Sequence, residues 1–202
     1  MKTRMIDIRL LLAVALVGCS EGKEHTAAPP RNEAVAATPA APSSQPGKAP
    51  ARQSAFTQLG MELCRTIEEN PDEGPYWRGS CPGYAGWRIE WYESDLRQGL
   101  ELIDKAGRKT DLGLSGVVAK GAFNNLMGAP IEWRGPDKMN PDTLIVRMGV
   151  DNEEEGRPQI SRLAVVRLSP TPCVIGVVEP SSGQNEQARA IADGTKRECL
   201  TD

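Results

Sequence analysis

Short segments rich in β-branched residues, separated by turn-forming residues, are the feature of this sequence that most constrains its fold. Three of them, 143–150, 160–168 and 173–178, follow one another, and turn clusters occupy 151–158 and 169–172 between them. β-Branched side chains favour strands, and consecutive strands joined by short turns pair in antiparallel order. We therefore expect an antiparallel meander in this part of the chain.

Earlier parts of the chain add further strands. Between 87 and 92, tryptophan and isoleucine alternate with arginine, glutamate and tyrosine, which gives a strand one apolar and one polar face. Segment 96–103 is expected to be its weaker partner, because a glycine interrupts it. Two short segments, 63–68 and 131–134, are expected to add edge strands. The pattern predicts an antiparallel sheet of about five to six strands.

One helix is expected at 182–193, near the C-terminus. Its apolar residues share one face, Ser182 or Gly183 is suited to cap its start, and Gly194 is suited to end it. A series of strands followed by a terminal helix indicates an α+β fold. We expect the helix to pack on one face of the sheet.

The N-terminus has the layout of an export signal, with basic residues before eight apolar residues at 10–17. This run is too short to span a membrane, which takes roughly twenty apolar residues. It ends in Leu16-Val17-Gly18-Cys19, which resembles the lipobox of bacterial lipoproteins. The resemblance implies that 1–18 is a lipoprotein signal peptide and that Cys19 is lipidated. Cleavage without lipidation is the alternative.

The resemblance to lipoproteins also implies a location. Ser20 follows the lipidated cysteine, and a residue other than aspartate there implies export to the outer membrane of Gram-negative bacteria. We therefore expect a protein of the cell envelope, held by acyl chains on the periplasmic face of the outer membrane. We expect the protein to associate with the membrane through its lipid anchor rather than through a transmembrane helix.

The residues after Cys19 divide into a tether and a domain. Segment 19–54 is rich in alanine, proline and serine and offers little to bury, so we expect a disordered tether. Segment 55–202 has the size of a single globular domain. That domain holds 17 basic and 23 acidic residues, and its negative charge excludes nucleic acid as an expected partner.

Four cysteines remain once Cys19 is acylated: Cys64, Cys81, Cys173 and Cys199. An oxidising compartment would pair them, and three connectivities exist. We favour the first with the second and the third with the fourth. After the third cysteine, a strand of about 20 Å and a returning helix of about 17 Å would bring the fourth beside it. A zinc site is the alternative, but the domain has no histidine and no short ligand spacing.

Catalytic motifs are not evident in the domain. Without a histidine it cannot build the usual serine or cysteine triads. Paired carboxylates, Glu90 with Glu93 or with Asp95, are the one catalytic arrangement that the sequence leaves open, as in glycoside hydrolysis. We expect no enzyme, no cofactor and no metal.

Aromatic residues are concentrated in one short stretch. Six of the seven tryptophan and tyrosine residues lie between positions 76 and 92. Trp87 and Trp91 alternate with Ile89 and are expected in the core. The others have apolar faces and polar edges that suit sugars or apolar peptides. The candidate binding face therefore consists of Tyr76, Trp77, Tyr84 and Tyr92.

Five short stretches of the domain resemble landmarks of a group of uncharacterised secreted proteins from alphaproteobacteria. The resemblance covers most of the domain and implies its compartment and fold, but none of the landmarks is a chemical motif. They are Cys81-Pro82-Gly83-Tyr84, Glu93-Ser94-Asp95-Leu96-Arg97, Phe123-Asn124-Asn125-Leu126, Ile131-Glu132-Trp133-Arg134 and Ala190-Ile191-Ala192-Asp193.

The sequence as a whole predicts an outer-membrane-anchored lipoprotein with a non-catalytic domain. That domain would bind an envelope component, such as peptidoglycan or an envelope protein, or would have a structural role in the envelope. One alternative is an inhibitor of an envelope hydrolase of the lysozyme type, because an acidic domain suits a basic enzyme. A carboxylate-based hydrolase is the other.

Overall fold

The computed structural model describes residues 51–70, 72, 76–126, 128–154 and 156–201. The predicted signal peptide, Cys19 and the predicted tether up to residue 50 lie outside these described residues. None of the described helices is long and apolar enough to cross a membrane. Regular structure begins at Gln53, slightly before the expected boundary at 55, because this segment pairs with a strand far along the chain.

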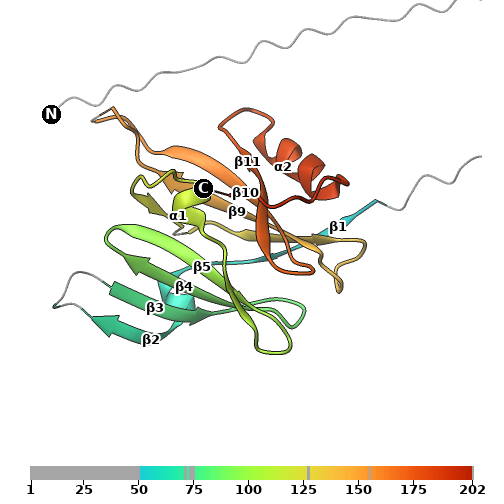
Figure 1. Cartoon of the computed structure of the whole chain (residues 1–202), viewed down its shortest axis with the longest axis horizontal. Coiled ribbons are helices and arrows are strands. Elements are labelled where there is room, and N and C mark those ends of the chain that lie inside the picture. The colour runs from blue at the N-terminus through green and yellow to red at the C-terminus, as the bar shows by residue number, and fades with distance from the viewer. Residues whose placement is uncertain (1–50, 71, 73–75, 127, 155, 202) are drawn as a thin grey trace, which may run out of the picture. The chain divides into compact units, whose positions relative to one another are not determined.

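Two antiparallel sheets make up most of the described chain (Figure 1). In the first sheet, a short strand β7 (Asn124–Asn125) pairs with the edge of β9 beside the main path. The strands of that path, in their spatial order, are β1 (Gln53–Thr57), β8 (Ile131–Gly135), β9 (Thr143–Val150), β10 (Ile160–Arg167) and β11 (Cys173–Val178).

The second sheet is a meander whose spatial order follows the chain. Its central hairpin turns at Asp95 and Leu96, which both have positive φ angles, 50° and 57°, as tight hairpin turns require. The strands are β2 (Arg65–Asn70), β3 (Tyr76–Cys81), β4 (Arg88–Ser94), β5 (Arg97–Ile103) and β6 (Lys109–Asp111).

Helices are few among the described residues. A 3-10 turn η1 (Met61–Leu63) precedes β2, and a short α1 (Leu114–Val117) follows β6. The longest helix, α2 (Gln184–Asp193), begins after Gly183 and ends at Gly194, as the sequence predicts. It covers the face of the first sheet that points away from the second sheet (Figure 1).

The main core lies between the two sheets. Alternate residues of each strand point inward, among them Ile89, Trp91 and Leu100 from the second sheet and Leu144 and Val146 from the first. All five are at most 1% exposed. A second, smaller core lies under α2, where alanines of the helix pack on β9, β10 and β11. The result is three layers, with the helix, the first sheet and the second sheet in that order.

Both disulfides form as the sequence predicts, Cys64 with Cys81 and Cys173 with Cys199. The first joins the segment before β2 to the end of β3. The second joins the start of β11 to the segment after α2. Past that bridge the backbone N–H of Leu200 donates to the carbonyl of Val174, 2.8 Å away. The segment after the helix therefore runs back along the sheet to reach its partner cysteine.

The predicted α+β class is confirmed, with its antiparallel strands, C-terminal helix and two disulfides. The meander of β9, β10 and β11 and the edge position of β2 are also as predicted. The prediction of an edge strand at 131–134 is wrong, because β8 lies between β1 and β9. β8 is an inner strand because β1 pairs with its outer side. β1 was not predicted, because the composition of the N-terminal segment resembles that of a disordered tether.

Candidate functional site

The four aromatic residues of the candidate binding face do not share one surface. Tyr76 and Tyr92 lie on the outer face of the second sheet, because they alternate along β3 and β4 with the core-facing residues. Trp77 lies on the core-facing side of β3, and Tyr84 lies in the loop between β3 and β4. Only Tyr76 and Tyr92 are therefore brought onto the same face.

Trp77 and Tyr84 contact tryptophans of the core. The ring of Trp77 meets that of Trp91 edge-on, with ring centroids 5.1 Å apart, and its indole N–H donates to Thr66 Oγ1 at 3.0 Å. The ring of Tyr84 lies 6.2 Å from that of Trp133. Both side chains are half-buried. Their contacts give them a role in packing.

A charged cluster occupies the centre of the outer face of the second sheet. Glu90 and Glu101 are directly opposite on β4 and β5, a pairing that repels unless cations intervene. Lys109 Nζ lies 2.6 Å from Glu90 and 3.3 Å from Glu101. Arg78 Nη1 lies 3.2 Å from Glu90 and also donates to Glu101. Each carboxylate is thus neutralised by two cations.

Tyr92 is tied into the edge of this cluster. Its hydroxyl donates to Asp111 Oδ2 at 2.9 Å, and the guanidinium of Arg78 lies 5.3 Å from the centre of its ring. The ring lies over Gly99, where any Cβ would come within 2.4 Å of it. Burial, followed by the charge of Asp111, raises the pKa of Tyr92. This phenol therefore stays protonated and acts as a donor.

The predicted catalytic carboxylates are not brought together. Glu93 points to the opposite side of β4 from Glu90, where it accepts a hydrogen bond from the side chain of Gln98 at 2.6 Å. Asp95 lies in the hairpin turn and pairs with Arg97. The carboxylate nearest to Glu90 across the strands is instead that of Glu101. This cross-strand pair was not among the sequence predictions.

The protonation state of Glu90 suits an ion pair better than an acid catalyst. Burial alone would raise its pKa, but hydrogen bonds from Lys109 and Arg78 outweigh burial, and the pKa is lowered. A general acid of a glycosidase needs a raised pKa so that it holds its proton near neutral pH. Glu90 is ionised there, so the geometry gives no support to the hydrolase hypothesis.

We expect Glu90→Gln to reduce the free energy of unfolding at pH 7 by about 1 to 2 kcal/mol, because hydrogen bonds to a charged group are lost. Since the folded-state pKa is lowered, the ionised form stabilises the fold above the ordinary pKa of 4.5 and ceases to do so as the pH falls through the lowered value. The difference from the unmodified protein should therefore shrink from about pH 5 downward.

Urea denaturation of both proteins across this pH range measures the effect. Glu198→Gln is the matched control, because Glu198 is exposed. The control should leave stability unchanged at every pH. A difference for Glu90→Gln that stays constant down to pH 3 would contradict the assigned pKa direction.

A groove of about 490 Å³ lies beside this cluster, at the end of the second sheet. One wall comes from the turn between β5 and β6, and the other comes from the turn between β10 and β11. Its volume falls in the range of small-molecule sites, about 300 to 1,000 Å³. The lining residues that matter below are Trp87, Lys105, Arg108, Lys109, Pro170 and Pro172.

Trp87 is positioned by the tight loop before β4. The backbone N–H of Trp87 donates to the carbonyl of Tyr84 at 2.9 Å, and Ala85 and Gly86 between them both have positive φ angles, 51° and 87°. Gly83 lies so close to this turn that a Cβ there would be 1.9 Å from the carbonyl oxygen of Trp87. The Trp87 side chain is half-buried, because it packs against the main core and also lines the groove.

The cationic wall is built on Asp104. Its carboxylate accepts the backbone N–H groups of Ala106 and Arg108, at 2.8 and 2.9 Å, and the Nε–H of Arg108 at 2.7 Å. These hydrogen bonds, that from the backbone of Arg108 first, lower the pKa of Asp104. Asp104 is therefore committed to holding the turn, while the Arg108 side chain remains 76% exposed.

The opposite wall is a proline-rich turn. Pro170 and Pro172 each have a φ angle restricted by their ring, which limits the conformations of this wall. At the start of the turn, the backbone N–H of Leu168 donates to the carbonyl of Asp142 at 2.9 Å. Hydrogen bonds therefore hold the turns on both sides of the groove in place.

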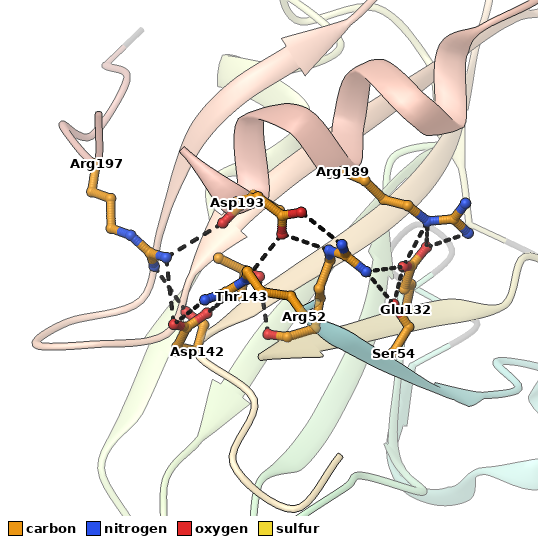
Figure 2. A network of polar contacts seen from close by, with 10 residues as sticks. Arg52, Ser54, Glu132, Asp142, Thr143, Arg189, Asp193 and Arg197 are labelled. Atoms are coloured by element: carbon orange, nitrogen blue, oxygen red, sulfur yellow. Dashed lines mark hydrogen bonds and ion pairs between the residues drawn. The ribbon is translucent and has the colours of Figure 1, made fainter. Parts of the chain in front are cut away.

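A second polar network lies under α2, on the side of the first sheet that this helix covers (Figure 2). Arg134 forms a forked pair with Asp193, both nitrogen–oxygen distances being 2.6 Å. Arg52 Nε lies 2.9 Å from Asp193, and Arg52 also pairs with Asp142. Hydrogen bonds from Arg134 are the main reason that the pKa of Asp193 is lowered. Arg197 joins at Asp142, 3.4 Å away.

The rest of this network holds the helix to β8. Arg189 of α2 makes a forked contact with Glu132, at 2.9 to 3.2 Å, and Ser54 of β1 also donates to Glu132 (Figure 2). The partners come from both ends of the described chain and from its middle. These charges are paired with one another. We therefore interpret the network as structural: it holds α2 and the C-terminal segment to β1 and the rest of the first sheet.

Among the described residues, no group of three or more histidine, cysteine, aspartate or glutamate residues could hold a metal ion. Comparisons of the chain with protein-family models, with curated proteins and with solved structures find no match. We therefore infer function from the geometry and charge of the groove.

The groove includes residues that the sequence analysis did not select. Trp87 was expected in the core, and its basic and proline neighbours were not singled out. The signals were present but weak: two glycines close before a tryptophan indicate a tight turn that can expose it, and paired prolines indicate a stiff turn. Nothing in the sequence shows that these two turns, more than sixty residues apart, meet.

Proposed function

We propose that this chain is an outer-membrane lipoprotein whose periplasmic domain is a non-catalytic binding module, and that the groove beside Trp87 is its binding site. The anchoring part of the proposal is supported by the lipobox resemblance at Cys19. It is also supported by two disulfides, which are typical of proteins that fold in oxidising compartments.

The observation that carries the binding part is the chemistry of the groove. It combines an aromatic side chain, a stiff proline wall and basic side chains in a single preformed concavity. Ligand sites commonly pair apolar walls with a few polar groups that fix orientation. The domain as a whole has more acidic than basic residues, so its overall charge does not explain why the groove is basic. We infer that it serves recognition of an anionic partner.

The anchor restricts which partners are within reach. A flexible tether of about 35 residues has a root-mean-square span of about 30 to 35 Å. A domain held on such a tether samples the periplasm close to the membrane. Peptidoglycan, which carries both sugar rings and carboxylates, combines the two kinds of group that the groove accommodates, and it is the envelope component that we propose as partner. An envelope protein is the alternative occupant.

The test is sedimentation with purified insoluble peptidoglycan, using the mature chain with Cys19→Ser so that acyl chains play no part. We expect the protein to pellet with peptidoglycan, and Trp87→Ala to weaken this binding about tenfold or more, as loss of a central aromatic contact does. Tyr76→Ala is the matched control, because Tyr76 lies on the outer face of the second sheet and does not line the groove. Melting temperatures of both variants show whether they remain folded.

The outcomes separate the alternatives. Failure to pellet, or equal binding by Trp87→Ala and Tyr76→Ala, would contradict the proposal. Retention of the chain on immobilised lysozyme without binding to peptidoglycan would favour the hydrolase inhibitor instead. Turnover of peptidoglycan that Glu90→Gln abolishes would favour the hydrolase.

A further inference from the structure

The charges and the walls of the groove indicate the chemical class of its ligand. We infer that it binds a saccharide that carries a carboxylate, with the sugar ring against Trp87 and the carboxylate between Lys105 and Arg108. This inference rests on the proposed function, because it names the chemical class of the ligand for the same site.

The basic residues that line the groove differ in how far their charges are already paired. Lys109 lines the groove, but its ammonium group is paired with Glu90 and Glu101. Lys105 has no ion-pair partner in the described part of the chain, and its alkyl stem lies over Gly86, where a Cβ would meet its Cε at 2.5 Å. That contact places the stem of Lys105 beside the loop that carries Trp87.

Arg108 supplies the second available donor group. Its Nε–H is bound to Asp104, with which the guanidinium forms an ion pair, whereas its terminal nitrogens make no hydrogen bond with any described residue. A guanidinium fork matches a carboxylate, and a neighbouring ammonium adds a further charge-assisted hydrogen bond. The only acidic residue among the lining residues, Asp104, is already engaged by three donors. The groove therefore presents two cationic groups to an anion.

The walls of the groove indicate which group accompanies the anion. An indole and two proline rings offer flat apolar surface, which a small hydrated anion such as inorganic phosphate would not use. A sugar ring has an apolar face of C–H groups and a polar rim of hydroxyls. The groove can accommodate both, since its lining includes the polar side chains of Ser169, Thr110 and Thr171.

The carboxylates of an acidic peptide could also pair with Lys105 and Arg108. The strands near the groove, however, offer a peptide backbone little to pair with. Extended peptides bind by adding a strand to a free sheet edge. One edge strand at the groove, β11, already accepts a hydrogen bond at Val174 from the backbone of Leu200, and the other, β6, is only three residues long (Lys109–Asp111). It offers few main-chain groups for pairing, so we favour the saccharide.

The experiment is calorimetric titration of the mature Cys19→Ser chain with two matched pairs of sugars. N-acetylmuramic acid is compared with N-acetylglucosamine, and glucuronic acid with glucose. In each pair the first sugar carries a carboxylate and the second does not. We expect each acid to bind at least tenfold more tightly than its neutral counterpart, since charge-assisted hydrogen bonds are lost in the neutral sugar. Tighter binding of the muramic acid would indicate peptidoglycan as the source, and tighter binding of the glucuronic acid an acidic polysaccharide.

Variants test whether the binding occurs in this groove. Lys105→Gln and Arg108→Gln should each weaken binding of the acids about tenfold while leaving the weak binding of the neutral sugars unchanged. Lys196→Gln is the control, because Lys196 is exposed and does not line the groove. Arg108→Gln keeps the backbone hydrogen bonds of Arg108 and Ala106 to Asp104, so the turn should persist, and the melting temperature checks this.

The inference is overturned if the neutral sugars bind as tightly as the acids, or if Lys105→Gln and Arg108→Gln bind the acids as the control does. It is also overturned if a short glutamate-rich peptide binds more tightly than either acid sugar. Failure of this inference can be distinguished from failure of the proposed function. If the sugars fail while binding to peptidoglycan still depends on Trp87, the groove is a binding site for another class of ligand.

Discussion

Trp91→Ala is expected to reduce the free energy of unfolding by about 3 to 5 kcal/mol, enough to unfold the domain under mild conditions. Trp91 is 1% exposed and lies in the core between the two sheets. Its removal would leave a large cavity and would deprive Trp77 of its edge-on ring contact. Chemical denaturation monitored by circular dichroism measures the change.

Trp91→Phe distinguishes loss of volume from loss of the indole itself. The Nε1–H of Trp91 is buried and has no hydrogen-bond partner among the described residues. An unsatisfied buried donor costs about 1 to 3 kcal/mol, so its removal should offset much of the smaller ring's loss of packing. We therefore expect the phenylalanine variant to be much closer to the unmodified protein than the alanine variant.

Tyr92→Ala is the neighbouring control, because Tyr92 lies on the outer face of the same strand and is only half-buried. It should cost clearly less than Trp91→Ala. Equal losses of stability in the two variants would contradict the assignment of alternate residues of β4 to a buried and an outer face.

Cys19→Ser is expected to release the protein from membranes completely. Thioether acylation requires the thiol of Cys19, so the serine variant has no acyl chains. Each buried methylene contributes about 0.8 kcal/mol, and two or three chains make attachment effectively permanent, so their loss removes the whole anchoring free energy. Membrane fractionation and incorporation of labelled fatty acid measure the effect.

Cys64→Ser is the matched control for this experiment. It removes the Cys64–Cys81 disulfide but leaves the predicted acylation site, so it should be labelled with fatty acid and stay with the membrane fraction. The lipobox prediction is wrong if the Cys19→Ser protein stays with membranes after a high-salt wash and neither form incorporates the label.

The meander of the first sheet could be predicted because its signals are local. The β-branched segments at β9, β10 and β11 are joined by short turns, and such strands pair with their neighbours in sequence. The helix α2 has glycines at both ends, which mark its bounds within the sequence. The disulfides followed from the lengths of one strand and one helix. In each case the information lies within a few tens of residues.

Strands that depend on distant partners could not be predicted. β1 has the composition of a tether boundary and is a strand because it pairs with β8 and because Arg52 is bound by Asp142 and Asp193. β3 pairs with its neighbours in sequence and was missed for another reason: Gly79 disfavours strands, but here it makes room for the ring of Trp77. These reasons exist only once the sheets have formed.

The sequence by itself determined the class of the fold, the order and ends of its regular meander and helix, and the disulfide pairing, because periodicity and turn chemistry act between near neighbours. Only the tertiary structure decided which aromatic residues face the core and which line the groove. Trp77 packs inward since strand register places it beside Trp91, and Trp87 reaches the groove since the turn before β4 meets the turn after β10. Register and the meeting of distant turns are set by the packing of whole sheets, which no local pattern records.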